Sequence, residues 1–129
     1  MNDAPRVLAV GDHFISSDVY VDALSDLEVS VTEIELHHSK KRQHEDQQVM
    51  EKSGPAAIEV SEGLVEAMRS HDLVVVHFAP VPKSVFADAS EVGAVFVART
   101  GVENVAMDAA SSTRMPVFDV SGRDASGVA

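Results

Sequence analysis

A continuous apolar run near the middle of the chain, Leu73–Val76, limits what this protein can fold into. Its sequence, LVVV, has no alternation of apolar and polar side chains, which predicts a strand covered on both faces. Such strands lie in the middle of parallel sheets, beneath helices. Ligands of open α/β sheets bind beyond the carboxyl ends of the strands. The residues that follow the run, His77, Phe78 and Ala79, therefore stand where a ligand is expected.

Four other segments have the pattern of strands. Three are short and apolar, and one alternates apolar and polar residues, as a strand with one exposed face does. They are residues 6–10, 94–98, 117–120 and, for the alternating segment, 29–36. Helix signals separate the strands along the chain. This alternation predicts a doubly wound, flavodoxin-like α/β domain whose five parallel strands lie in the order 2-1-3-4-5.

Small polar residues mark the expected starts of helices. Ser16 or Ser17 is expected to cap the first helix, Ser61 a later one and Asn104 the last. Helical spacing places one set of apolar residues on the buried face of the first helix, namely Val19, Tyr20, Ala23, Leu24 and Leu27. A short helix after Pro82 is expected to turn three apolar residues inward, Val85, Phe86 and Ala89.

Residues 37–60 interrupt this alternation with a strongly polar segment. Its first part, 37–52, has no apolar periodicity, and we interpret it as a partly helical insert on the surface. The insert contains His37, His38 and His44, but their spacing matches no zinc motif and the chain has no cysteine. We therefore expect no metal site, and we expect the basic residues of the insert to be solvated.

Composition excludes several classes of partner. The net charge of −11 argues against nucleic acid, because binding to phosphates needs a basic face. No apolar run is long enough to span a membrane. The first residues, MNDAPRVLAV, contain no secretory apolar region of normal length, so a cytoplasmic protein is expected.

Three ligand classes of related folds fit the sequence poorly. Asp12 follows the first strand, as an acidic residue does in phosphoacceptor receiver domains, but His77 stands where their second aspartate would be and the fifth strand has no lysine. We interpret Asp12 as a turn or cap residue. Flavin is disfavoured because the loop GDHFISS lacks a Thr/Gly-rich phosphate cradle. The seven glycines form no G-x-G-x-x-G motif, so a dinucleotide has no pyrophosphate cradle here.

The loops after the third and fourth strands, residues 77–79 and 99–101, should be neighbours in this sheet. Arg99 offers a planar fork suited to a carboxylate, and Gly101 permits close approach of the backbone. Two structural alternatives remain open. His77 would then bond a backbone carbonyl, and Arg99 would form a surface ion pair.

A series of motifs in the last third of the chain resembles one enzyme family. Gly101-Val102-Glu103-Asn104, an alanine-rich helix with Ala109-Ala110, Met115-Pro116-Val117 and the final stretch 124–129 follow in that order. They are similar to the end of the substrate-binding lobe of the D-isomer-specific 2-hydroxyacid dehydrogenases, which include phosphoglycerate dehydrogenase. The segments 6–20 and 74–82 are similar to the same lobe.

This resemblance implies a division of labour between two lobes. Residues 1–120 would form the substrate-binding lobe, and residues 121–129, with Arg123 and Asp124, would begin the hinge to an NAD-binding domain. NAD would lie between the lobes, and a hydride would pass between nicotinamide and C2 of a small 2-hydroxy or 2-keto acid. The full-length enzyme would be a homodimer.

The resemblance also assigns the site residues. Substrate would be bound by His77, Phe78, Ala79, Arg99 and Gly101, and Thr100 would contact NAD. The family's catalytic arginine, glutamate and histidine belong to the NAD lobe. No catalytic residue is therefore expected in this chain, and the 129 residues alone are expected to be inactive.

Several residues depart from the family pattern. His77 and Phe78 stand where phosphoglycerate dehydrogenases carry arginine and serine, which argues against a phosphorylated substrate. Arg114 occupies a position that is often glycine, and a left-handed conformation there would cost roughly 1–2 kcal/mol. The alternative function is a free-standing, non-catalytic, flavodoxin-like module that binds a ligand or a partner. A dehydrogenase lobe should instead expose apolar surface near its termini and tend to associate.

Overall fold

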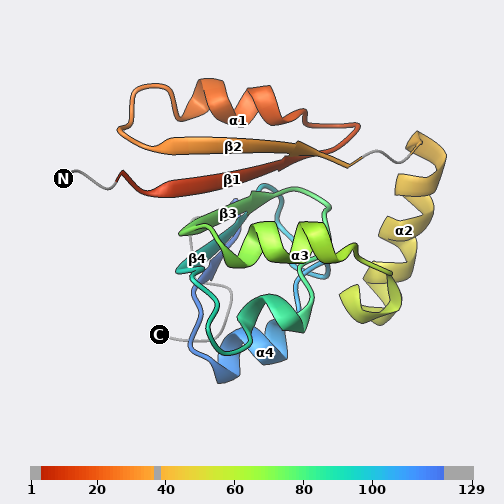
Figure 1. Cartoon of the computed structure of the whole chain (residues 1–129). Helices are drawn as coiled ribbons and strands as arrows, with labels where there is room; N and C mark the ends of the chain where they lie inside the picture. The colour runs from red at the N-terminus through yellow and green to blue at the C-terminus, as the bar shows by residue number, and fades with distance from the viewer. Residues whose placement is uncertain (1–3, 37–38, 121–129) are drawn as a thin grey trace.

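Five parallel strands form one sheet in the order β2-β1-β3-β4-β5 in the computed structural model, which describes residues 4–36 and 39–120 (Figure 1). The predicted fold class and strand order are confirmed. The strands are β1 (Arg6–Gly11), β2 (Ser30–Glu35), β3 (Leu73–Val76), β4 (Ala94–Val97) and β5 (Val117–Phe118). As expected, the apolar run is the central strand, and Val74, Val75 and Val76 are buried.

Helices cover both faces of the sheet and one of its edges. They are α1 (Ser17–Ala23), α2 (Lys40–Ser53), α3 (Glu62–Arg69) and α4 (Met107–Ser112), with short 3-10 turns η1 (Pro55–Ala57) and η2 (Lys83–Phe86). Figure 1 shows α2 beyond the ends of the β1 and β2 arrows, at the carboxyl edge of the sheet. The position of α2 is important because functional side chains are expected at this edge.

The core has two parts, one on each face of the sheet. On one face, Leu8, Val74 and Val76 pack with Leu64 and Met68 of α3. The core cluster on the other face is smaller, and its buried members are Val7, Ala9, Tyr20 and Val75. Alternate residues of β1 and β3 thus serve opposite faces, which is why these strands are apolar without interruption.

The predicted inner face of α1 is only partly confirmed. Tyr20 is buried and Leu24 is half-buried against the sheet, whereas Val19 is 53% and Leu27 58% exposed. The helix ends at Ala23, so Leu27 lies beyond it, and the short helix buries a narrower face than five residues need. Ser16 is the N-cap residue, but the first helical N–H, from Ser17, donates to the Glu35 carboxylate 2.6 Å away.

The other helix signals had mixed outcomes. Ser61 caps α3 as predicted, and its Oγ accepts a hydrogen bond from the Leu64 N–H at 3.2 Å. Val85 and Phe86 are buried as predicted. Ala89 is exposed, because the η2 turn ends before it and its backbone has a φ of 70°.

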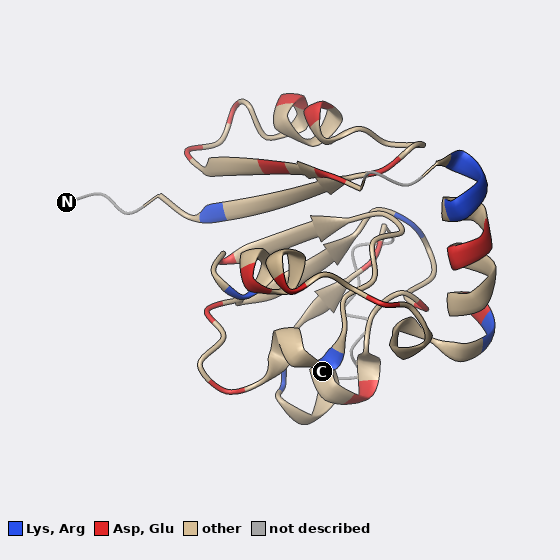
Figure 2. Cartoon of the chain, turned by 45° about the vertical axis from the view of Figure 1, so that its right-hand side comes forward, with Lys and Arg blue, Asp and Glu red and all other residues tan. Residues whose placement is uncertain are grey.

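The polar insert is partly helical as expected, and its residues 40–53 form a regular 14-residue helix, α2. Its N-cap Ser39 accepts a hydrogen bond from the Arg42 N–H at 3.1 Å. Gln43, Gln47 and Met50 recur at helical spacing and are buried. Periodicity of apolar residues did not reveal this face because two of its three buried side chains are amides. Figure 2 shows Lys and Arg gathered at the start of α2, in a chain where acidic residues are otherwise widespread.

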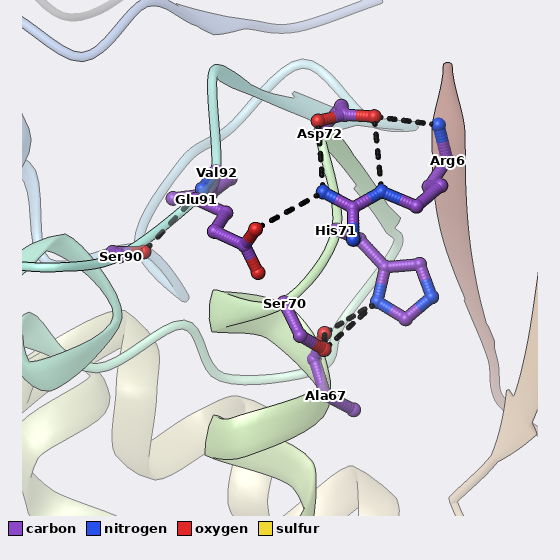
Figure 3. Close-up of polar contacts among 8 residues, drawn as sticks. All are labelled: Arg6, Ala67, Ser70, His71, Asp72, Ser90, Glu91 and Val92. Atoms are coloured by element: carbon purple, nitrogen blue, oxygen red, sulfur yellow. Dashed lines mark hydrogen bonds and ion pairs between the residues drawn. The ribbon is translucent and has the colours of Figure 1, made fainter. Parts of the chain in front are cut away.

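At the opposite edge of the sheet, where the strands begin, Arg6 forms ionic contacts with Asp72 and Glu91 (Figure 3). The Arg6 backbone N–H and guanidinium donate to the Asp72 carboxylate at 2.7–3.3 Å, and Nη2 also donates to Glu91 at 3.4 Å. These hydrogen bonds hold the pKa of Asp72 below its ordinary value. They join β1 to the residues that lead into β3 and β4. Among the described residues, no helix is long and apolar enough to cross a membrane.

Candidate functional site

The candidate site lies where β1, β3 and β4 end. These strands are neighbours in a parallel sheet, so their carboxyl ends bring Asp12, His77 and Arg99 to one edge. The predicted proximity of the loops at 77–79 and 99–101 is seen directly, because the guanidinium of Arg99 stacks on the ring of Phe78. The same edge also contains Asp12 and Phe14, which the sequence analysis did not place in the site.

Asp12 is the most constrained polar residue of the site. It is 5% exposed and its carboxylate accepts four hydrogen bonds. Oδ1 accepts from the backbone N–H groups of Phe14 at 2.8 Å and Ile15 at 2.9 Å. Oδ2 lies 3.1 Å from His77 Nδ1 and 3.2 Å from the Phe78 backbone nitrogen. Asp12 does form a turn, as interpreted from the sequence, and it also joins the loop after β1 to the loop after β3.

The environment of Asp12 favours its ionised form. Burial alone would raise the pKa of Asp12. The hydrogen bond with His77 and those from the Ile15 and Phe14 N–H groups together lower it by more than burial raises it. The net result is a pKa below the ordinary value of an aspartate. Asp12 is therefore a carboxylate at neutral pH.

His77 and two phenylalanines form an aromatic cluster on this carboxylate. The rings of His77 and Phe78 are 4.2 Å apart, and the ring of Phe14 meets them edge-on at 6.3 and 6.1 Å. Phe14 is 60% exposed, so it forms the outer side of the cluster. The partner of His77 Nδ1 is thus a carboxylate, so the open alternative of a backbone carbonyl partner is not realised.

Arg99 follows β4, and its guanidinium covers the ring of Phe78. Its Cζ atom is 4.3 Å from the ring centroid, a distance at which cation–π attraction operates. Its Nη2 is 3.5 Å from Glu103 Oε1, so the alternative of a local ion pair is realised. The side chain retains 18% exposure. A guanidinium with only one long contact to a carboxylate keeps donors available for a ligand.

Gly101 permits a close approach, but the approaching group is part of the chain itself. A Cβ at this position would clash with the carboxylate of Glu103. The negative charge of Glu103 thus occupies the space beside the Gly101 backbone. Thr100, next to it, is exposed.

Asn104 has a role different from the predicted helix cap. It is fully buried, and its Nδ2 donates to the carbonyl oxygens of Ala79 at 2.8 Å and His77 at 3.3 Å. The helix α4 begins later, at Met107, with Ala106 as its N-cap residue. Asn104 thereby fixes the backbone of the loop after β3. Ala79 is itself buried, so it would contribute backbone rather than side chain to a ligand.

The helix α2 supports the site from the side. Gln43 Oε1 accepts a hydrogen bond from the His13 backbone N–H at 2.9 Å, and Gln43, Asp46 and Met50 border a small cavity beside Phe78. Within the described ranges, no group of three histidine or acidic side chains is placed to hold a metal ion. The predicted hinge residues Arg123 and Asp124 lie outside the described residues.

Comparisons with known proteins give likeness of structure without likeness of sequence. No family model matches the chain, and no curated protein matches it in sequence. A 3-phosphoglycerate dehydrogenase from Entamoeba histolytica, solved with NAD+, matches 91% of this chain with a TM-score of 0.61 and 14% identity. A D-2-hydroxyisocaproate dehydrogenase matches 89% with a TM-score of 0.56 and 14% identity.

A third solved structure, the PH0520 protein from Pyrococcus horikoshii OT3, matches 92% of the chain with a TM-score of 0.51 and 14% identity. The chain spans only 33%, 29% and 28% of these three structures. At this identity the likeness establishes the fold. The chain therefore has the fold of a domain that occurs in two dehydrogenases of 2-hydroxy acids or their relatives.

Proposed function

We propose that this chain is the substrate-binding domain of an NAD-dependent D-2-hydroxyacid dehydrogenase, an oxidoreductase that acts on the CH–OH group of its donor. The observation that carries the proposal is the match of about nine tenths of the chain to a 3-phosphoglycerate dehydrogenase and to a D-2-hydroxyisocaproate dehydrogenase, of which it covers 33% and 29%. The motif series around Gly101 and Asn104 supports it independently.

The carboxyl edge of the sheet would bind the acid. Arg99 is placed to pair with the substrate carboxylate, and the rings of Phe78 and Phe14 would cover the rest of the molecule and exclude water. A single guanidinium, already shared with Glu103, suits one carboxylate better than a doubly charged phosphate. The proposed substrates are therefore small, unphosphorylated 2-hydroxy or 2-keto acids.

NAD would be held mainly by a second domain, which would also supply the acid–base residues. Thr100 is exposed beside the site and would contact the cofactor, and the carboxylate of Glu103 lies against the adjacent backbone. The complete enzyme would be a homodimer. The 129-residue chain by itself would orient the substrate but would not catalyse hydride transfer.

Two measurements on the purified chain test this function. Oxamate, an unreactive analogue of a 2-keto acid, should shift the NMR signals of Phe78, Arg99 and Gly101, and Arg99→Gln should abolish the shifts. Arg114→Gln, which changes an exposed arginine away from the site, is the matched control and should leave them unchanged. NADH oxidation with pyruvate or 2-ketoisocaproate should be undetectable. Turnover by the pure chain, or unchanged signals with oxamate, would contradict the proposal.

An apolar hollow bears on the second candidate function, a free-standing binding module. It measures about 240 Å³ and is lined only by Tyr20, Ala23, Leu24, Leu73, Val75 and Phe96, between α1 and the sheet. Apolar surface of this kind favours association or a covering domain. Light scattering and binding of an apolar dye separate the two candidates. A monodisperse monomer that binds no dye would favour the free-standing module over a dehydrogenase domain.

A further inference from the structure

We propose that Asp12 is a positioning residue for ligand binding: it holds His77 in the Nδ1–H form, so that Nε2 meets the ligand and binds a carboxylate only together with a proton. The choice of ligand rests on the proposed function, whereas the tautomer of His77 does not. Nothing in the sequence assigned such a role to Asp12, which was interpreted as a turn residue.

The hydrogen bonds of Asp12 determine which nitrogen of His77 carries a proton. An ionised carboxylate can only accept hydrogen bonds. Oδ2 accepts from the Phe78 N–H at 3.2 Å, and the same oxygen is 3.1 Å from His77 Nδ1. Nδ1 must therefore be the donor. In neutral imidazole the other nitrogen, Nε2, then has a lone pair and no hydrogen.

The carboxylate cannot rotate away from this arrangement at low cost. Its side chain is 1% exposed, and Oδ1 accepts from the N–H groups of Phe14 and Ile15 in its own loop. The imidazole is held in turn by its contacts with the rings of Phe78 and Phe14. Both partners are therefore oriented before any ligand arrives, which lowers the entropic cost of binding.

Nε2 is the nitrogen that remains for a ligand. Among residues 4–36 and 39–120 it has no hydrogen-bond partner, and the side chain of His77 is 14% exposed. A lone pair on Nε2 repels a carboxylate, whereas a protonated Nε2 donates a hydrogen bond to it. Binding of a carboxylate at Nε2 therefore requires one proton from solvent, and no covalent bond forms or breaks.

The charged groups around His77 come from three elements. Asp12, after β1, contacts the ring directly. After β4, Arg99 lies over the ring of Phe78 and is paired with Glu103. On α2, Asp46 borders the cavity beside Phe78 and pairs with Arg42. Of these charged groups, Asp12 is the one that contacts the imidazole of His77 directly. We therefore expect a ligand carboxylate and a proton to bind together.

The first test measures the tautomer in the unliganded 129-residue chain. Nitrogen-15 NMR of the histidine rings, with His77→Gln to identify the signals, should show neutral His77 protonated on Nδ1 and not on Nε2. In Asp12→Asn the amide can turn its donor toward Nδ1, so the Nε2–H form should replace it. Asp72→Asn removes a carboxylate that accepts from Arg6 at the far edge and should leave His77 unchanged. An Nε2–H form in the unaltered chain would overturn the proposal even if Asp12→Asn does not fold.

The second test measures proton linkage with oxamate. At pH values where the imidazole of the free chain is neutral, the apparent Kd for oxamate should rise tenfold per pH unit, and calorimetry in buffers of different ionisation enthalpy should show uptake of one proton. The Kd of His77→Gln should lose this slope. A Kd independent of pH, or a slope that His77→Gln retains, would overturn the linkage. If oxamate does not bind, both the proton-linked binding at Nε2 and the proposed function are overturned. The tautomer of His77 is decided by the first test alone.

Discussion

Asp12 and His77 are 65 residues apart in the chain, yet Oδ2 of Asp12 lies 3.1 Å from Nδ1 of His77. One follows β1 and the other follows β3, and these strands are neighbours in the sheet. The Asp12 carboxylate also accepts hydrogen bonds from the backbone of both loops, so it joins the loop after β1 to the loop after β3. The carboxyl edge is thus organised around a buried charge.

Asp12→Asn is expected to lower the free energy of unfolding by about 2 kcal/mol, because a charged acceptor of four hydrogen bonds becomes an amide with one oxygen and two N–H donors. Urea unfolding measures the difference. Glu28→Gln makes the same chemical change at an exposed position and should stay within about 0.5 kcal/mol of the unaltered chain. Equal stability of Asp12→Asn and the unaltered chain would show that this carboxylate contributes nothing.

Acid should remove the contribution of Asp12. Its pKa in the folded chain is below the ordinary value of 3.8 that applies when unfolded. The stabilisation is therefore complete above that value and is lost as pH falls through the lower, folded pKa. The difference in stability between the unaltered chain and Asp12→Asn should be constant from pH 7 to 5 and shrink below pH 4. A difference that grows on acidification would contradict the sign of the shift.

Asn104→Ala is expected to cost about 2 kcal/mol, because it leaves the buried carbonyl oxygens of Ala79 and His77 without the amide donor. Amide hydrogen exchange should rise in the loop after β3 more than in β1. Gln48→Ala removes an exposed amide from α2 and serves as control. Uniform exchange changes over the whole sheet would argue against a local role for Asn104.

Tyr20 should titrate with an unusually high pKa. Burial, followed by the charges of Asp12 and Glu35, raises its pKa to about 12. It is the only tyrosine, and tryptophan is absent, so absorbance near 295 nm follows it without interference. Because the folded pKa exceeds the unfolded one, ionisation of Tyr20 costs no stability below pH 10 and destabilises the chain progressively as pH rises from 10 through 12. A midpoint near pH 10 would contradict its burial.

Tyr20→Phe is expected to leave stability unchanged or to increase it slightly. The hydroxyl of Tyr20 is buried and has no hydrogen-bond partner among the residues that the structure describes, so its removal relieves desolvation and loses no bond to them. Thermal unfolding provides the measurement. Clear destabilisation would mean that this hydroxyl has a bound partner in solution.

Arg114→Gly should stabilise the chain by about 1 kcal/mol. Arg114 has a φ of 58°, the left-handed conformation foreseen from its place in the motif series, and glycine adopts it without the steric cost of a Cβ. Arg114→Ala keeps the Cβ and is the control, with little expected change in the urea midpoint. If both variants gained equally, loss of the charge rather than backbone strain would be the cause.

The sequence predicted the sheet well because its strands carry uninterrupted apolar runs. Apolar runs such as Leu73–Val76 and Ala94–Val97 are typical of strands covered on both faces. The alternation of strands with helices then limits the sheet to a few possible strand orders. The location of the site followed from the same argument. His77 and Arg99 end neighbouring strands, so their proximity required no knowledge of side-chain contacts.

Other features depend on contacts between distant residues. Asn104 has the residue type of a helix cap, but the unpaired carbonyl groups of the loop after β3 bind it instead. The buried face of α2 consists largely of amides that meet the loop after β1, and no local periodicity reports this. In both places a polar side chain is buried because a backbone group elsewhere in the fold needs a partner.

The sequence by itself determined the α/β class, the strand order, the central place of Leu73–Val76 and the proximity of the loops at 77–79 and 99–101, because hydrophobic burial is encoded in local pattern. Only the tertiary structure decided that Asp12 belongs beside these loops and that His77 faces a carboxylate. Hydrogen bonding is directional and acts over about 3 Å, so its partners are set by how distant loops pack and not by the residues beside them in the chain.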